Sequence, residues 1–172
     1  MTAKNPELRY IAIFVLFWIL LLGMATYFFG ALSSRQTNPN QELVSRTQNG
    51  AVEVQLEANR QGHYLANGTI NGHTVTFFLD TGATMVSVPQ RIAEEAGLSR
   101  GARGRARTAA GTIDIWRSTI DQLSLGAIKL RNVQATINPA MDMDKVLLGM
   151  SVLGEVDFSQ ESGTLTLRQR TR

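Results

Sequence analysis

The sequence predicts an all-β domain, built as a small barrel, that follows a single membrane-spanning helix. Polar and apolar residues alternate over residues 52–56 and again over 63–70, a pattern typical of half-buried strands. Further strand-like segments follow up to Leu167, separated by turn residues such as Gly126 and the pair Asn138-Pro139. This spacing of short strands is typical of small barrels.

The membrane-spanning helix is predicted over residues 10–29. These 20 residues carry no charge and consist mainly of Ile, Leu, Val, Phe and Trp, which is about the length that crosses a bilayer as a helix. Lys4 and Arg9 precede the run and only Arg35 follows it closely. By the positive-inside rule, residues 1–9 are cytoplasmic and the rest of the chain lies on the other side.

A cleaved signal peptide is the alternative interpretation of the same segment, with residues 31–33 as a small-residue cleavage site. The apolar run is longer than the 7–15 residues usual for the core of such signals. The length therefore favours an anchor that stays attached. Residues 30–50 are mostly polar and predict a flexible linker, because they bury too little apolar surface to become ordered. The folded domain is expected over residues 51–172.

Composition excludes several kinds of function. The chain has no cysteine, so it has no disulfide, thiolate metal site or cysteine nucleophile. His63 and His73 have no carboxylate at ligand spacing, and no metal or cofactor is predicted. Arginine alternates over residues 100–107, but no aromatic residue lies between these arginines to stack on bases. We interpret the stretch as a solvated strand and predict no nucleic-acid partner.

Helix and turn signals place the remaining elements. Asn71-Gly72 is the dipeptide that most favours a two-residue hairpin turn. After Pro89, residues 90–96 form a short helix candidate that Gly97 closes. Residues 108–112 lie between two strand-like segments and resemble the tip of a hairpin.

The chemistry is predicted at Asp80. Strand-forming residues on both sides of Asp80-Thr81-Gly82 indicate two strands that meet at a tight loop. Gly82 leaves room above the carboxylate for the main chain of a ligand, and the Thr81 hydroxyl can hold the loop in place. These features favour a fixed, accessible acid, and we interpret Asp80 as a catalytic carboxylate.

The segment Phe78 to Ala83 matches the hydrophobic-hydrophobic-Asp-Thr/Ser-Gly-Ala/Ser motif of aspartic proteases. Val146-Leu147-Leu148-Gly149 matches their second motif of two aliphatic residues and glycine, which passes under the active-site loop. The chain therefore resembles the retropepsin-like (clan AA) aspartic proteases. With Met150-Ser151 after Gly149, it is similar to their bacterial membrane-anchored subgroup. The resemblance implies a single-lobe acid protease barrel with a short C-terminal helix from Met150.

The resemblance also implies site residues and partners. Ala109, Ala110, Gly111 and Thr112 correspond to the flap that closes over substrate, and Asp80 to one member of a catalytic pair. Two carboxylates must share one proton in this chemistry, and no other aspartate of the chain is followed by Thr/Ser-Gly. The second carboxylate is therefore expected from Asp80 of another copy, in a homodimer that cuts polypeptide substrates without a cofactor.

The implied location is the bacterial inner membrane, with one membrane span, a cytoplasmic N-terminus and a periplasmic protease domain. Two alternatives stay open. The domain could be a membrane-tethered module that binds a peptide or partner without cutting it, or a soluble periplasmic protease released by signal cleavage.

Overall fold

The computed structural model describes residues 6–48, 50–108 and 111–170. The chain divides into two compact units, Met1–Gln36 and Thr37–Arg172. The first unit is the N-terminal helix and the second is the β domain.

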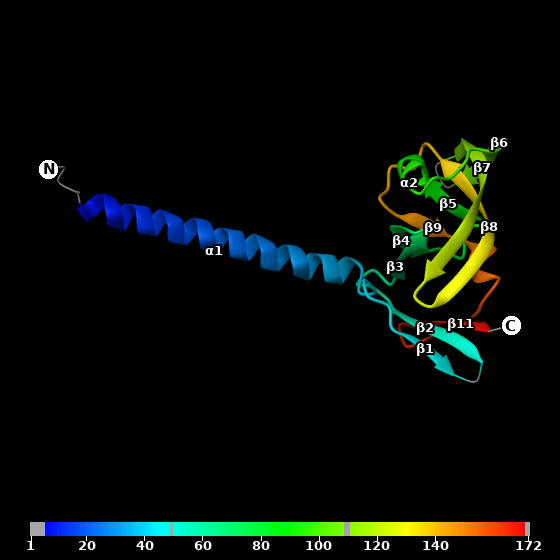
Figure 1. Cartoon of the computed structure of the whole chain (residues 1–172), viewed down its shortest axis with the longest axis horizontal. Coiled ribbons are helices and arrows are strands. Elements are labelled where there is room, and N and C mark those ends of the chain that lie inside the picture. Colours follow the sequence, from blue (N-terminus) through cyan, green and yellow to red (C-terminus); the bar gives the residue numbers. More distant parts are fainter. Residues whose placement is uncertain (1–5, 49, 109–110, 171–172) are drawn as a thin grey trace. The chain divides into compact units, whose positions relative to one another are not determined.

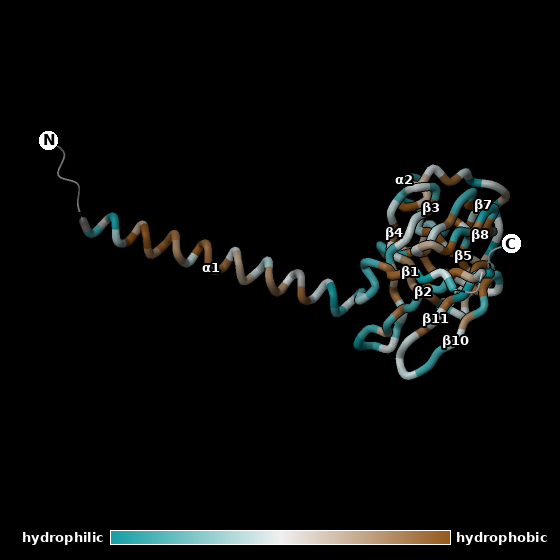
Figure 2. The backbone as a smooth tube through the Cα atoms, turned by 60° about the horizontal axis from the view of Figure 1, so that its bottom comes forward, coloured by the Kyte–Doolittle hydropathy of each residue, from teal (hydrophilic) through white to brown (hydrophobic). Residues whose placement is uncertain are grey.

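Helix α1 (Pro6–Thr37) accounts for the described part of the first unit. The large apolar side chains from Tyr10 to Leu32 are exposed, and Figure 2 shows hydrophobic residues along most of the helix. A helix that is apolar all round is suited to burial on all sides, as in a membrane span or in the core of a large protein. Within the described residues, the segment Arg9–Thr37 is the one helix long and apolar enough to cross a membrane, a test that a signal sequence would also pass.

The β domain consists of two sheets (Figure 1). The larger sheet has seven strands in the order β3-β4-β9-β5-β8-β7-β6, and β3 also pairs with β7, which closes most of this sheet into a barrel. Its strands are β3 (Leu65–Ile70), β4 (His73–Leu79), β5 (Val86–Pro89), β6 (Arg103–Thr108), β7 (Gly111–Leu125), β8 (Ile128–Asn138) and β9 (Val146–Leu148).

The smaller sheet has four strands in the order β1-β2-β11-β10. Its strands are β1 (Ser45–Gln48), β2 (Ala51–Glu57), β10 (Asp157–Glu161) and β11 (Thr164–Arg170). β2 and β11 come from opposite ends of the domain and pair from Ala51↔Arg170 to Glu57↔Thr164. This pairing joins the start of the domain to its end.

The core lies where the two sheets meet. Phe77 on β4, Leu148 on β9 and Ile137 on β8 belong to the same buried cluster as Leu56 and Leu167 of the smaller sheet. Burial of each such side chain stabilises the fold by about 1.5–3 kcal/mol. The strands that flank Asp80 are therefore anchored in the most buried part of the domain.

The local predictions for turns and helices agree with the structure. Asn71 and Gly72 both have positive φ, 50° and 84°, as a two-residue turn between β3 and β4 requires. Helix α2 (Gln90–Glu95) follows Pro89, and helix α3 (Met150–Leu153) follows Gly149. The predicted all-β fold with a short C-terminal helix is confirmed.

The sequence predicts a flexible linker over residues 30–50, but the described residues of this range are ordered. α1 continues to Thr37, and the compact β unit begins there instead of at residue 51. Asn40 is 5% exposed and binds the backbone of both Glu57 and Leu65, while β1 pairs with β2. Polar side chains order this segment because they satisfy strand-end backbone groups, which does not require apolar burial.

Candidate active site

Asp80 directly follows β4 and begins the loop that leads to β5. Its side chain is partly buried, and its Oδ1 accepts a hydrogen bond from the Gly82 backbone N–H at 2.9 Å. The backbone N–H of Ala83 donates to the Asp80 carbonyl oxygen at 3.1 Å. A carboxylate that binds the backbone two residues ahead forms an Asx turn, and this turn holds the Asp80 side chain in a defined orientation.

Gly82 keeps the carboxylate accessible. A Cβ atom at this position would lie 3.1 Å from Asp80 Oδ1, closer than ordinary van der Waals contact. The absence of a side chain therefore leaves one side of the carboxylate free for a ligand.

The second motif lies directly beside the Asp80 loop. β9 runs between β4 and β5, parallel to β4, with Leu79 opposite Leu148. The Asp80 N–H donates to the Leu148 carbonyl at 3.1 Å. The two sequence motifs, far apart in the chain, are thus joined by strand pairing.

Gly149 allows the closest approach between the two motifs. A Cβ atom at this buried position would lie 2.5 Å from the Met85 carbonyl oxygen and 2.6 Å from that of Ala83. Both contacts are shorter than any real Cβ atom makes, and both involve backbone atoms, which cannot swing away. Only glycine fits between β9 and the Asp80 loop.

Helix α3 holds the far side of the loop through backbone hydrogen bonds. The Met150 N–H donates to the Ala83 carbonyl at 2.8 Å, and the Ser151 N–H donates to the Thr84 carbonyl at 2.9 Å. The Ser151 hydroxyl also accepts from the Val86 N–H at 3.1 Å and donates to the Gln134 carbonyl at 3.2 Å. Ser151 therefore ties the loop, β5 and β8 together, a role that its sequence position alone did not reveal.

Thr81 takes no part in this hydrogen bonding. Its side chain is exposed and makes no hydrogen bond with any residue that the structure describes, although the sequence suggested that its hydroxyl would hold the loop. Backbone contacts to β9 and α3 hold the loop instead. The face of the loop that carries Thr81 is left open to solvent.

The other aspartates lie on other elements. Asp114 on β7 pairs with Arg103 at 2.7 Å, and Asp157 on β10 with Arg170 at 3.8 Å. Asp144 pairs with Arg91. Asp142, like Asp144, lies between β8 and β9, and Asp121 lies on β7. Among the described residues no group of three or more His, Cys, Asp or Glu side chains could hold a metal ion.

Two of the four predicted flap residues, Gly111 and Thr112, begin strand β7 of the β6–β7 hairpin. Thr108 pairs with Gly111, and the Thr108 hydroxyl donates to the Gly111 carbonyl at 2.9 Å. Gly111 has φ 119°, and Thr112 is exposed. Ala109 and Ala110 lie outside the described residues. The β6–β7 hairpin therefore exists as predicted.

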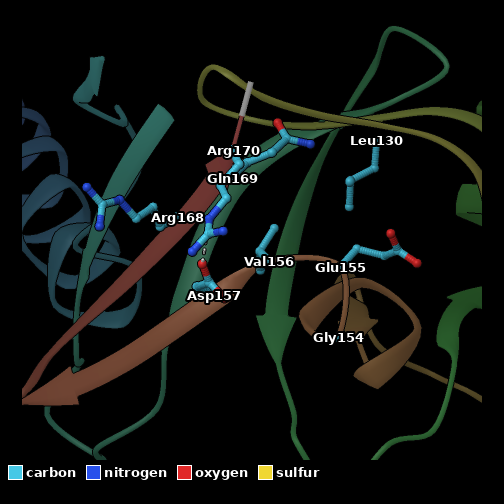
Figure 3. A pocket seen from close by; sticks show the side chains of 8 residues that line it. All are labelled: Leu130, Gly154, Glu155, Val156, Asp157, Arg168, Gln169 and Arg170. Atoms are coloured by element: carbon cyan, nitrogen blue, oxygen red, sulfur yellow. Dashed lines mark ion pairs between the residues drawn. The ribbon is translucent and has the colours of Figure 1, made fainter. Parts of the chain in front are cut away.

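A cavity of about 860 Å³ lies apart from Asp80. Figure 3 shows it between the α3–β10 connection, β8 and β11, with the Arg170–Asp157 ion pair beside Val156. No residue of the Asp80 loop lines this cavity. It is an open depression between the two sheets and contributes nothing to the chemistry of Asp80.

Comparison with known proteins identifies the family. Residues 66–155, just over half of the chain, match the family described as "gag-polyprotein putative aspartyl protease". The matched region contains both Asp80 and Gly149. The chain belongs to this family of retropepsin-like aspartic proteases.

Solved structures support the fold. The chain is similar to the crystal structure of a retropepsin-like aspartic protease from Rickettsia conorii, with a TM-score of 0.58 and 22% identity, over 74% of this chain and 94% of that one. The EIAV protease, solved with the inhibitor HBY-793, gives a TM-score of 0.46 and 15% identity, over 56% and 89% of the two chains. The first similarity confirms the predicted single-lobe barrel.

One curated relative is longer than this chain. A Sinorhizobium protein, described as an uncharacterized protein in the cobV 5′ region, is 28% identical over 125 residues. The match covers 71% of this chain and 54% of that protein, so the chain spans about half the length of its relative.

Proposed function

We propose that the protein is a membrane-anchored aspartic endopeptidase in which the Asp80 carboxylates of two copies activate water. The observation that carries this proposal is the Asp80 loop itself. Its carboxylate is fixed by the Gly82 N–H, and the loop rests on Gly149, where no other residue fits. Such precise support for an accessible acid is expected for a catalytic group.

The reaction needs both carboxylates and no cofactor. Two like charges about 3 Å apart do not both ionise readily, so the pair shares one proton at working pH. The ionised member takes a proton from water, while the protonated member donates to the oxygen of the scissile peptide bond. Water attacks the carbonyl carbon directly and forms a tetrahedral gem-diol. The carboxyl group that took the proton from water then gives it to the peptide nitrogen, while the other carboxylate takes a proton from one hydroxyl of the gem-diol. The C–N bond breaks, and the amine and the acid are released.

A homodimer supplies the second carboxylate. The chain has one Asp-Thr-Gly motif, and the Thr81 face of that loop is exposed in the single chain. A two-fold axis through this face would place two Asp80 side chains together, with Thr81 and Gly82 of both copies as the floor. The β6–β7 hairpin, with Gly111 and Thr112 near its tip, would then close over a bound polypeptide.

Helix α1 would anchor the enzyme in the bacterial inner membrane, with the N-terminus in the cytoplasm and the protease domain in the periplasm. The length and composition of Arg9–Thr37 support a membrane span, and Lys4 and Arg9 favour this orientation. Confinement to one membrane raises the effective concentration of partner copies without any new contact. Anchoring in the membrane would therefore favour dimerisation.

The test is peptide cleavage by the full chain in detergent micelles, compared with Asp80→Asn and measured with and without pepstatin. We expect cleavage by the wild-type chain, inhibition by pepstatin, and only background cleavage by the variant. The variant should stay folded, because an amide oxygen at position 80 still accepts from the Gly82 N–H. Asp121→Asn, an exposed aspartate on β7, is the matched control.

Two outcomes would replace parts of the proposal. Tight binding of peptides with no cleavage at any pH would favour a binding module without protease activity. Loss of the protein from membranes on alkaline extraction would favour a soluble protease released by signal cleavage.

A further inference from the structure

Strand β6 is the last strand of the seven-stranded sheet. Among the described residues it pairs only with β7, from Arg103↔Trp116 to Thr108↔Gly111. Figure 1 shows it at the margin of the β domain beside β7. Backbone N–H and C=O groups along the free edge of such a strand form a template for another strand.

Strand β6, which forms this free edge, carries a regular row of positively charged side chains on one face. Arg103, Arg105 and Arg107 occur at every second position, so they share one face of the strand, and all three are exposed. We call these three residues the arginine row. Asp114 binds Arg103 at 2.7 Å, whereas Arg105 and Arg107 form no ion pair with any residue in the described ranges.

Arg100 adds a further positive charge beside the arginine row, and the Trp116 ring contacts the guanidinium groups of Arg100 and Arg103. The guanidinium carbons of Arg100 and Arg103 lie 5.9 and 5.8 Å from the centre of the Trp116 ring, a distance at which cations bind aromatic faces. Glu94 is already engaged by Arg100 at 3.0 Å. Asp114 lies opposite Arg105 in the strand register but is already engaged by Arg103. With three arginines facing this one acid, the arginine row keeps an excess of positive charge.

We propose that β6 binds an extended polypeptide segment with acidic side chains at every second position. A strand added to this edge would place alternate side chains on the face of the arginine row, within cross-strand contact distance. Opposite charges in such pairs stabilise the added strand. A second copy of β6 is a poorer occupant, because it would bring three more arginines to the same edge.

This binding requires no catalysis by Asp80. β6 is one arm of the hairpin that carries the candidate flap, so a docked segment would lie along that hairpin. The site is therefore a surface for recognising a polypeptide by charge and spacing, apart from the peptide bond that is cut. If β6 binds no such segment, the proposed protease activity still stands. If Asp80 has no protease activity, binding at β6 still stands.

The test uses the full chain carrying Asp80→Asn in neutral detergent micelles, so that no cleavage competes with binding. Fluorescence anisotropy measures the Kd of a dye-labelled peptide with glutamate at every second position. Two probes serve as controls: an isomer with the same glutamates in one run, and an oligonucleotide of equal charge. We expect the alternating peptide to bind at least about tenfold more tightly than either control, and more weakly as salt is added.

Charge reversal locates the site. Arg105→Glu/Arg107→Glu should weaken binding of the alternating peptide by at least about tenfold, and Arg105→Gln/Arg107→Gln should weaken it less. The control Arg46→Glu/Arg168→Glu changes net charge equally on the other sheet and should leave Kd within about twofold, with thermal unfolding measured for every variant. Equal binding of the three probes would show that binding depends on charge alone and not on the spacing of the acidic side chains. An unchanged Kd in the β6 variants would exclude β6 as the binding site. Either result overturns the proposal.

Discussion

Gly149 is the residue on which the geometry of the Asp80 loop depends most directly. The carbonyl oxygens of Ala83 and Met85 occupy the space of a Cβ atom at this position, while the N–H of Met150, the next residue, binds the Ala83 carbonyl. The same glycine therefore packs against the loop and positions a hydrogen bond to it. A larger residue at position 149 should displace the Asp80 carboxylate, although the new side chain would contact the Ala83 and Met85 carbonyls and not Asp80.

We predict that Gly149→Ala lowers the free energy of unfolding by about 1–3 kcal/mol, the usual cost of overpacking, and strongly reduces peptide cleavage. The added methyl group must push the Asp80 loop away from β9. Gly104→Ala on β6 is the control, because its Cβ would lie at an ordinary 3.7 Å from Ile115. Denaturant unfolding and cleavage rates measure both effects. Wild-type stability and activity in Gly149→Ala would show that the loop tolerates this displacement.

At the level of elements, Asn40 connects the segment after α1 to both sheets. Its side-chain amide donates to the carbonyls of Glu57, at the end of β2, and Leu65, at the start of β3. Its side-chain oxygen accepts from the Glu57 N–H at 2.8 Å. Asn38 adds bonds to Asn40 and to Asn67 on β3. This segment is part of the fold and not a tether attached to it.

We predict that Asn40→Ala destabilises the β domain by about 2–3 kcal/mol, because it leaves the buried carbonyl of Leu65 and the partly buried backbone groups of Glu57 without their partner. Glu42→Ala, an exposed neighbour, should change stability by less than about 0.5 kcal/mol. Urea unfolding of the full chain in micelles provides the comparison. Equal midpoints for the two variants would mean that water replaces Asn40 without cost.

The elements also show how far the sequence could predict this structure. The Asn71-Gly72 turn, the helix after Pro89 and the Asp80 loop follow from local residue chemistry, and the structure contains all three. The roles of Asn40 and Ser151 did not follow, because their partners Glu57, Leu65, Gln134 and Val86 lie far away in the sequence. Such hydrogen bonds become visible only when the strands are in place.

For the whole molecule, we predict one membrane orientation. A reporter fused after Arg172 should behave as an exported protein, because Lys4 and Arg9 favour a cytoplasmic N-terminus. The measurement is the activity of paired reporters, one active only in the periplasm and one only in the cytoplasm. Replacing Lys4 and Arg9 by glutamine should weaken this preference. Activity of the cytoplasmic reporter in the unaltered chain would contradict the orientation.

Dimerisation predicts a dependence on concentration. Active sites scale with dimers, so specific activity of the chain in micelles should fall on dilution below the dissociation constant of the dimer. Confinement in a membrane should oppose this loss. Constant specific activity, with only monomer seen in sedimentation, would mean that one chain forms a complete site.

In the proposed enzyme each active site contains two Asp80 carboxylates from two chains. The test is to mix wild-type and Asp80→Asn chains at a constant total concentration at which both are dimeric and exchange freely. Only pairs of wild-type chains would be active, so an equal mixture should retain about one quarter of the all-wild-type activity. If one chain formed a complete site, the mixture would instead retain about one half of the activity, and a shared pair of Asp80 carboxylates would be excluded.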